Sequence, residues 1–281
     1  DNYYAFRARY CEEKTMHLGS QRQFKVIAGF RRLDELNLKI SSFAARLRKD
    51  ECLDLPDKIY TRRKCDLTPE QKSLYSSLKK DFLIQLKEDD TISASIVLTK
   101  LLRFMQIVTG HSGTDGGDIV SIPSKRIGCL MEILAETTGK VVIWSNFRKC
   151  IQDIELAIAK EYGAAAVCSF YGDTKRQERV SHVEKFQDPD SGLRFFVGNP
   201  SAAGFGITLT EANTCIYFSR DFRLDSRLQS EDRLHRIGQT KAVTYIDLYS
   251  PDTIEEKVLA ALRNKIGLSA QVLGEKAQQW L

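Results

Sequence analysis

Short apolar runs alternate with polar stretches of helical spacing through the second half of the chain. The apolar runs lie at 140–144, 165–170, 195–198, 215–218 and 243–249. Each is apolar at nearly every position rather than at alternate ones, which is typical of strands that are buried on both faces. Such strands alternating with helices predict an α/β fold, in which a doubly wound parallel sheet is covered by helices on both faces.

The stretches between the runs predict the covering helices. In the first stretch, Ile127, Leu130 and Leu134 fall on one face of a helix, as expected for a helix that packs on a sheet. A last helix opens at Thr253 after the final run. Helices are predicted at 125–136, 146–162, 175–186, 226–236 and 253–264.

The first 123 residues have a different pattern, which is basic and irregular at first and then helical. Helices are predicted at 33–47, 68–87 and 94–108, and a strand at 58–65. Pro56 ends the first helical stretch, and Thr68 followed by Pro69 has the form of a helix N-cap and first turn.

A loop rich in glycine and aspartate at 110–119 separates the two patterns. We therefore expect three regions. A basic linking segment, helical in part, covers 1–66, a helical insertion with its loop covers 67–123, and the lobe that contains the sheet covers 124–281.

Composition narrows the class of protein without identifying it. The chain is 42% hydrophobic with a net charge of +5, a mildly basic balance that permits nucleic acid as a partner. Its seven cysteines include no CxxC pair, which disfavours a zinc site or disulfide framework and fits a reducing compartment. No apolar stretch approaches the roughly 20 residues of a membrane helix, and no signal peptide is recognisable. We expect no membrane partner, no bound metal, and a location in the cytoplasm, nucleoid or nucleus.

Three polar or glycine-rich loops follow predicted strands. They contain Ser145 and Asn146, Gly172 and Asp173, and the stretch at 199–206. Ligands of doubly wound sheets bind at the carboxyl ends of the strands, so these loops are candidates for a functional rim. The alternative is that they are ordinary turns, which also favour Gly, Asn and Asp.

The segment QSEDRLHRIGQ at 229–239 is the strongest single feature of the sequence. On a helix, Gln229, Arg233 and Arg236 share one face. Two guanidiniums on one stripe suit a phosphate or carboxylate, because each offers a planar fork of donors. The alternative is a solvated charged face with local ion pairs, Asp232–Arg236 and Glu231–His235.

This segment resembles the last helicase motif of the Swi/Snf-type members of helicase superfamily two. Other segments resemble further motifs of that family in the same order, namely 140–151, 171–187, 201–218 and 250–259. The stretch at 45–78, with its Arg-Lys run and Leu-Pro-x-Lys, is similar to the region that links the two lobes of these motors. The resemblance therefore implies a C-terminal RecA-like lobe together with the inter-lobe linking region.

One segment departs from the pattern of chromatin remodellers. Phe222-Arg223-Leu224 stands where those members have Trp-Asn-Pro. At these three positions, the sequence resembles the phage and bacterial members of the family more than the chromatin remodellers.

The resemblance also implies roles for single residues. The implied catalytic residues are Gln229, Arg233 and Arg236, with the two arginines as arginine fingers. The implied nucleotide-binding residues are Gly204, Gly206 and Asp232. The implied DNA-binding residues are Ser145, Asn146, Lys175, Arg176 and Thr208, with an electrostatic contribution from Lys125, Arg148 and Lys149.

The family implies ATP and Mg²⁺, shared with an N-terminal RecA-like lobe, and double-stranded DNA as a partner. The chain has no GxxxxGK[ST] loop, and Asp34-Glu35 lies in a polar helical stretch rather than after an apolar strand. We therefore expect ATP and Mg²⁺ to be held mainly by the other lobe, and the isolated chain to be inactive. The alternative is a non-catalytic module that docks DNA or protein on the same fold.

Overall fold

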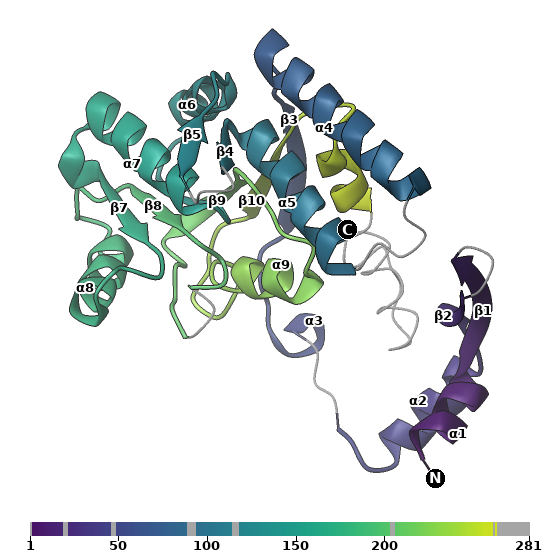
Figure 1. Ribbon diagram of the computed structural model, residues 1–281. Helices are drawn as coiled ribbons and strands as arrows, with labels where there is room; N and C mark the ends of the chain where they lie inside the picture. The colour runs from purple at the N-terminus through teal and green to yellow at the C-terminus, as the bar shows by residue number, and fades with distance from the viewer. Residues whose placement is uncertain are drawn as a thin grey trace.

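The computed structural model describes residues 2–18, 22–45, 49–88, 94–113, 118–202, 206–260 and 262. Its centre is a six-stranded sheet in the order β3-β10-β9-β6-β8-β7, in which every neighbouring pair is parallel (Figure 1). The strands are β3 (Lys58–Lys64), β6 (Lys140–Trp144), β7 (Val167–Phe170), β8 (Phe195–Gly198), β9 (Ala212–Tyr217) and β10 (Val243–Tyr249).

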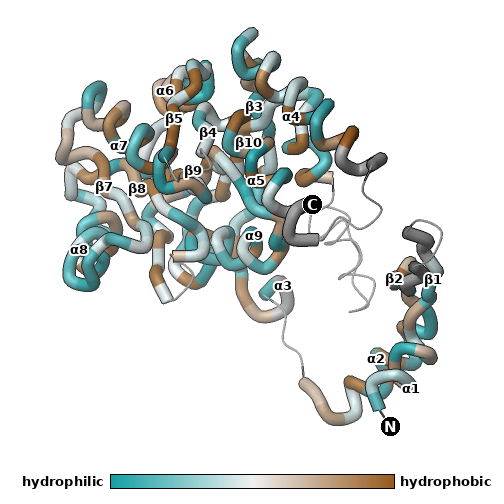
Figure 2. The backbone as a smooth tube through the Cα atoms, in the orientation of Figure 1, coloured by the Kyte–Doolittle hydropathy of each residue, from teal (hydrophilic) through white to brown (hydrophobic). Residues whose placement is uncertain are grey.

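Helices cover both faces of this sheet, as predicted. The helices α6 (Arg126–Glu136) and α7 (Arg148–Tyr162) pack on one face in a first apolar core. On the other face, α8 (Arg176–Gln187) packs through Phe186 in a second apolar core, and α9 (Leu224–Glu231) lies against this face through buried polar side chains, such as Ser230, whose hydroxyl lies 2.7 Å from that of Tyr217. Successive residues of β6 point to opposite cores, so all five are buried. Figure 2 shows the resulting contrast between apolar strands and the hydrophilic α8.

The long apolar runs predicted the central strands well. The runs at 140–144, 195–198 and 243–249 are strands with those bounds. The strand β9 begins at Ala212, earlier than predicted, and β7 begins only at Val167 because residues 164–166 form a 3₁₀ turn.

The edge strand β3 belongs to this sheet although it lies in the segment we assigned to the lobe linker. It pairs with β10 in parallel from Val243↔Lys58 to Tyr249↔Lys64. The three-region division stays a prediction, but residues 58–64 are part of the sheet.

Two helices and a short hairpin pack beside the sheet. The helix α4 (Pro69–Glu88) begins with the predicted cap, in which Thr68 and Gln71 exchange hydrogen bonds of 3.1 and 3.2 Å. The side chain of Gln71 also donates to the carbonyl of Ile107 at the end of α5 (Ala94–Thr109). The predicted loop at 110–119 is instead partly a hairpin of β4 (His111–Gly113) and β5 (Ile119–Ser121).

Residues 2–18 and 22–45 form a small unit to one side of the sheet in Figure 1. Its elements are α1 (Tyr3–Tyr10), the antiparallel hairpin of β1 (Cys11–Leu18) and β2 (Arg22–Phe30), and α2 (Leu33–Ser41). We predicted irregular structure before a helix at 33–47, and both parts are corrected, because the hairpin precedes α2 and this helix ends at Ser41. A one-turn helix, α3 (Lys49–Cys52), follows.

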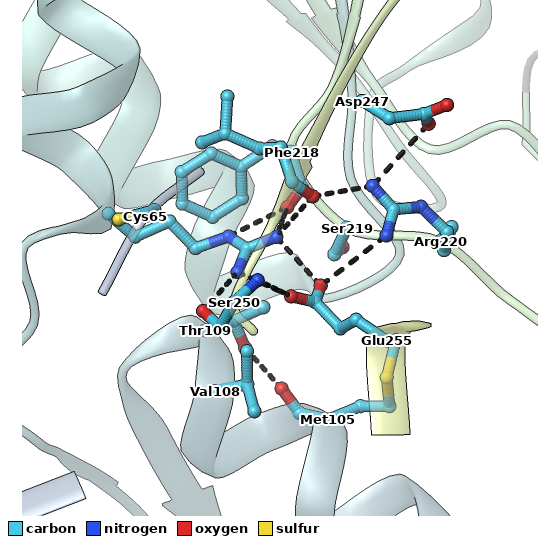
Figure 3. A network of polar contacts seen from close by, with 12 residues as sticks. Cys65, Met105, Val108, Thr109, Phe218, Ser219, Arg220, Asp247, Ser250 and Glu255 are labelled. Carbon is cyan, nitrogen blue, oxygen red and sulfur yellow. Dashed lines mark hydrogen bonds and ion pairs between the residues drawn. The ribbon is translucent and has the colours of Figure 1, made fainter. Parts of the chain in front are cut away.

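A buried guanidinium joins the helices to the carboxyl ends of the sheet. Arg126, 1% exposed, donates to the carbonyls of Phe218 and Leu248 and forms an ion pair of 2.7 Å with Glu255. Glu255 also accepts a hydrogen bond of 2.8 Å from the Ser250 backbone nitrogen (Figure 3). Burial alone would lower the pKa of Arg126, but the charge of Glu255 outweighs it and the pKa is raised.

Replacing Glu255 by Gln should destabilise the protein strongly. The variant leaves the Arg126 charge buried without its carboxylate, a change that costs about 3–5 kcal/mol of unfolding free energy. The control is Glu136→Gln, which removes the half-exposed ion pair between Arg63 and Glu136 and should cost less than about 1 kcal/mol. Urea unfolding measures the free energy of unfolding of both variants. An equal loss in the two would show that the buried ion pair stabilises the protein no more than the half-exposed one.

Candidate functional site

The structure divides the predicted site residues between two edges of the sheet. Ser145 and Asn146 follow the carboxyl end of β6, and Lys175 and Arg176 follow that of β7. The arginine segment lies at the opposite edge, because Gln239 Nε2 donates to the carbonyl of Ala212, the first residue of β9. The rim that we predicted at the carboxyl ends therefore contains only part of the candidate set.

Arg233 and Arg236 lie on a sequence of tight turns rather than on a helix. The helix α9 ends at Glu231, so the predicted helix at 226–236 is wrong over its last residues. The backbone of residues 232–239, which we name the arginine turn, is closed by hydrogen bonds from His235 to Glu231 (3.0 Å) and from Gln239 to Arg236 (3.0 Å). Gly238 has a φ of +99°, which an L side chain rarely adopts.

Inward-facing side chains fix the arginine turn to the sheet. Leu234 is fully buried in the second core, and His235 Nε2 lies 2.7 Å from the carbonyl oxygen of Pro56. Gln239 Nε2 donates to the carbonyls of Thr210, Ala212 and Leu234 at 3.0–3.2 Å. These anchors alternate with Arg233 and Arg236, which are only partly buried. The turn therefore holds two partly buried arginines on a backbone that is fixed by its inward-facing side chains.

The two guanidiniums lie close enough to influence each other. The pKa of Arg233 is lowered, first by burial and then by the positive charge of Arg236, while Asp232 opposes both. An anion bound between the arginines would relieve this repulsion. Gln229, which we predicted on the same helical face, is an exposed residue of α9.

The acidic residues of this segment do not make the ion pairs of the alternative interpretation. Asp232 pairs with Lys49 at 2.5 Å rather than with Arg236. Glu231 is buried and pairs with Arg227 at 2.7 Å and Lys58 at 3.1 Å rather than with His235. Both acidic side chains are thus taken by cations outside the arginine turn, so the ion pairs within the segment are replaced by contacts with Lys49, Lys58 and Arg227.

The glycine-rich loop before β9 is described only in part. Gly204 lies outside the described residues. Gly206 is exposed with a φ of +78°, and a Cβ added there would meet open space. Thr208 is half-buried, three residues before Glu211, whose backbone nitrogen donates to Gln187. Gly206 therefore keeps the backbone conformation and the free space that close approach of a ligand requires.

Ser145 has an internal role at the carboxyl edge. Its hydroxyl has no exposed surface and lies 3.0 Å from that of Ser219, which also accepts a hydrogen bond of 2.9 Å from the Asn146 backbone nitrogen. The predicted contact between the Ser145 hydroxyl and a DNA phosphate is therefore not supported by the structure. Asn146 stays half-exposed, and its carbonyl accepts a hydrogen bond of 3.0 Å from Asn199.

Lys175 and Arg176 are exposed at the start of α8. The loop before them is held by Arg179, whose guanidinium donates to the carbonyls of Tyr171, Gly172 and Thr174 at 2.8–3.0 Å. The other cations predicted to attract DNA differ in whether they form ion pairs within the protein. Lys125 is exposed, whereas Arg148 pairs with Asp173 at 2.6 Å and Lys149 with Asp153.

A chain of buried charges was missed by the sequence reasoning. Arg220 lies 3.4 Å from Asp247, and Arg227 bridges Asp247 and Glu231 at 2.7 Å each. The chain runs from the carboxyl end of β9 to the end of α9, directly before the arginine turn. A signal was present, because Asp247 interrupts the apolar run at 243–249 and a buried charge needs partners.

The donor set of the arginine turn suits a phosphate group. Guanidinium forks match phosphate oxygens in pairs of parallel hydrogen bonds. Within the described ranges, no group of three or more His, Cys, Asp or Glu side chains is arranged to hold a metal ion. Among those same residues, no helix is both long enough and apolar enough to cross a membrane.

Comparison with known families and proteins places the chain among helicase-like proteins. Residues 125–238 match the helicase conserved C-terminal domain family. The SWI/SNF chromatin-remodeling complex subunit snf22 of Schizosaccharomyces pombe is 28% identical over 247 residues, which are 81% of this chain and 14% of that protein. The ATP-dependent DNA helicase DDM1 of Arabidopsis thaliana is 35% identical over 146 residues, which are 52% of this chain and 19% of that protein.

Solved structures give the same result. The Sulfolobus solfataricus SWI2/SNF2 ATPase core in complex with dsDNA is 32% identical with a TM-score of 0.62, and the match covers 88% of this chain and 53% of that one. The SWI2/SNF2 ATPase C-terminal domain of the same organism is 28% identical with a TM-score of 0.57, and the match covers 80% of this chain and 92% of that domain. These matches confirm the RecA-like fold.

The chain spans less than a fifth of the curated relatives named above. Those relatives and the Sulfolobus structures are eukaryotic and archaeal, so they do not support the expected closeness to phage and bacterial members.

Stability at acidic pH should depend on His111, which supports the loop at Asn146. This ring is buried against Phe147 and lies 3.6 Å from Cys150 Sγ, and burial lowers its pKa to about 4. An unfolded histidine titrates near 6.5, so the unfolded state takes up the proton first. Stability is therefore lost as the pH falls from about 6.5 through about 4.

The His111→Gln variant should lose about 2 kcal/mol less unfolding free energy than the unmodified protein between about pH 7 and about pH 4.5. Urea unfolding at both pH values measures the difference. Parallel losses in the two proteins would mean that His111 is not the group that titrates.

Proposed function

We propose that this chain, which carries the C-terminal lobe of a SNF2-type helicase-like ATPase, supplies Arg233 and Arg236 to an ATP site that it shares with an N-terminal RecA-like lobe. The observation that supports this most is the arginine turn. Its backbone is fixed by Leu234, His235 and Gln239, while Arg233 and Arg236 are only partly buried, and the charge of Arg236 lowers the pKa of Arg233.

The chemistry of these groups fits phosphoryl transfer. Negative charge on the transferred γ-phosphoryl group must be neutralised in the transition state, and an arginine that does so contributes about 10³–10⁵ in rate. Arg233 and Arg236 would reach the γ-phosphate across the cleft between the lobes. Gln229, one turn of helix earlier, would orient the phosphates, and Gly206 would allow close approach of the backbone.

ATP and Mg²⁺ would be held mainly by the other lobe, because this sequence contains no GxxxxGK[ST] loop. Asp232 was expected beside the nucleotide. Its ion pair with Lys49 favours an indirect role for it, in which it positions the arginines. Hydrolysis would then depend on closure of the lobes, since only closure brings the arginines to the phosphates. For the same reason, this lobe alone would not hydrolyse ATP.

The opposite edge would contact double-stranded DNA. Exposed Lys175 and Arg176 and the half-exposed Asn146 would contact phosphates, which position a protein on DNA without reading its sequence. Thr208, which we predicted to bind DNA with them, lies next to Leu209, whose backbone nitrogen donates to the Arg233 carbonyl at 2.9 Å, so it is at the edge of the arginine turn. The Sulfolobus relative was solved with dsDNA, which supports this assignment. ATP-driven opening and closing would move the protein along the duplex, in a compartment that holds DNA.

Phe222-Arg223-Leu224 would distinguish this protein from remodellers that have Trp-Asn-Pro there, in the manner of phage and bacterial members.

The rival proposal is a docking module that keeps the fold without catalysis. Such a module would keep its function after loss of both arginines.

Replacing either Arg233 or Arg236 by Ala in the full-length protein should lower the DNA-stimulated kcat for ATP hydrolysis by at least about 100-fold, because charge on the transferred phosphoryl group is no longer neutralised. The control is Arg63→Ala, a half-exposed arginine on β3 away from the turn, which should keep the unmodified rate. Steady-state ATPase assays with duplex DNA measure this. Rates equal to the unmodified protein in folded variants would favour the docking module.

Replacing Lys175 and Arg176 together by Ala should weaken DNA binding without changing kcat at saturating DNA. Loss of two phosphate contacts should reduce the slope of log affinity against log salt by about 2. The matched control is Lys160→Ala, an exposed lysine in the last turn of α7. Fluorescence anisotropy with a labelled duplex measures the slope, and an unchanged slope would remove these residues from the DNA site.

A further inference from the structure

Residues 49–60 lie along the end of α9 and the arginine turn, and they contact both. Lys49 begins the short helix α3, and Lys58 and Tyr60 belong to the edge strand β3. Within the described part of the chain, this stretch connects the small N-terminal unit to the sheet, except for residues 46–48. It is therefore where a movement of the preceding segment would reach the lobe first.

The contacts hold the residues on either side of Arg233. Before it, Glu231 accepts hydrogen bonds from Lys58 at 3.1 Å and from the Tyr60 hydroxyl at 2.7 Å. Asp232, its immediate neighbour, pairs with Lys49 at 2.5 Å. The end of α9 and the first residue of the turn are thus both held from residues 49–60.

Residues 49–60 also contact the backbone and side chain that follow Arg233. His235 Nε2 donates to the carbonyl of Pro56 at 2.7 Å, and its own carbonyl accepts a hydrogen bond of 3.4 Å from Lys49. Arg236 follows His235 directly. Lys49 contacts both Asp232 and His235. Its side chain therefore holds the backbone on both sides of Arg233, and the second contact is directly before Arg236.

These contacts differ in strength. Glu231 and His235 are buried, so their hydrogen bonds to Pro56, Lys58 and Tyr60 are shielded from solvent. The pair between Lys49 and Asp232 is different, because both side chains are 45% exposed. Exposed pairs contribute little to stability, so this one can break and re-form without unfolding the lobe.

We propose that Lys49 is a positioning residue that holds the arginine turn in the orientation that hydrolysis requires. The inference rests on the proposed function, since it gives the two arginines their role in ATP hydrolysis. Through Lys49, the orientation of Arg233 and Arg236 depends on the segment that links the lobes. A break of this one contact loosens the turn while the core anchors Leu234 and Gln239 stay in place.

A merely stabilising role makes a different prediction. An exposed ion pair that only adds stability shifts the melting temperature slightly and leaves kcat unchanged. A positioning role leaves the melting temperature nearly unchanged, lowers kcat and leaves KM for ATP unchanged, because the arginines act on the transition state.

The experiment compares Lys49→Gln and Lys49→Arg with Lys64→Gln in the full-length protein. Lys64 is the matched control, because it is 57% exposed and pairs with Asp66 at 3.1 Å, outside the arginine turn. The first readout is amide hydrogen exchange of the peptide covering residues 232–239, which does not depend on catalysis. The second is the DNA-stimulated ATPase rate, with Arg236→Ala measured beside it.

We expect Lys49→Gln to raise exchange in this peptide and to lower kcat by about threefold to tenfold. Lys49→Arg keeps the positive charge, so its exchange rate and kcat should equal those of the unmodified protein. Lys64→Gln should change neither the exchange rate nor kcat. If Arg236→Ala abolishes hydrolysis but Lys49→Gln behaves like Lys64→Gln in both readouts, the positioning role is wrong and the proposed function stands. If Arg236→Ala keeps the unmodified rate, the proposed function is wrong and the catalytic role of Lys49 is overturned with it.

Discussion

A buried guanidinium requires partners for its charge, and the structure is organised around the partners of Arg126. Arg126, at the start of α6, is held by the carbonyls at the carboxyl ends of β9 and β10 and by Glu255. These bonds fix where the two strands end and how the following segments leave the sheet. The charge of Glu255 lies 3.8 Å from Arg220, which continues the chain of buried charges through Asp247. The last members of that chain, Arg227 and Glu231, end where the arginine turn begins.

The sheet keeps two kinds of proposed chemistry apart. The exposed cations at its carboxyl edge, Lys175 and Arg176, are suited to a DNA backbone, and the arginine turn at its amino edge is suited to a phosphate group. A rigid parallel sheet lies between them. The two edges are joined through the sheet with its buried charges and also along α8, which begins at Arg176 and ends at Gln187, a residue that donates to Thr210 at 3.0 Å. Residues 49–60 contact the arginine turn from outside, and their outermost contact with it is an exposed ion pair.

The sequence predicted well what depends on local pattern. Apolar runs predicted β6, β8 and β10 with their bounds, since strands buried on both faces must be apolar throughout. Contacts between distant segments were not predictable. The pairing of β3 with β10 and the Lys49–Asp232 pair join residues more than 180 positions apart, and no local pattern encodes them. The helix at 226–236 was overextended because the spacing of its arginines imitates a helical face. Tertiary bonds from Gln239 and His235 instead determine how residues 232–239 turn.

The most direct test of the central claim is the affinity of the full-length protein for a transition-state analogue. ADP with aluminium fluoride mimics the transferred phosphoryl group, whereas ADP alone lacks it. If the arginine turn neutralises that group, Arg236→Ala should weaken binding of ADP with aluminium fluoride by at least about 100-fold and leave the affinity for ADP unchanged. If the variant binds both ligands as tightly as the unmodified protein does, the arginine turn does not face the γ-phosphate, and the account of this lobe as half of an ATP site is contradicted.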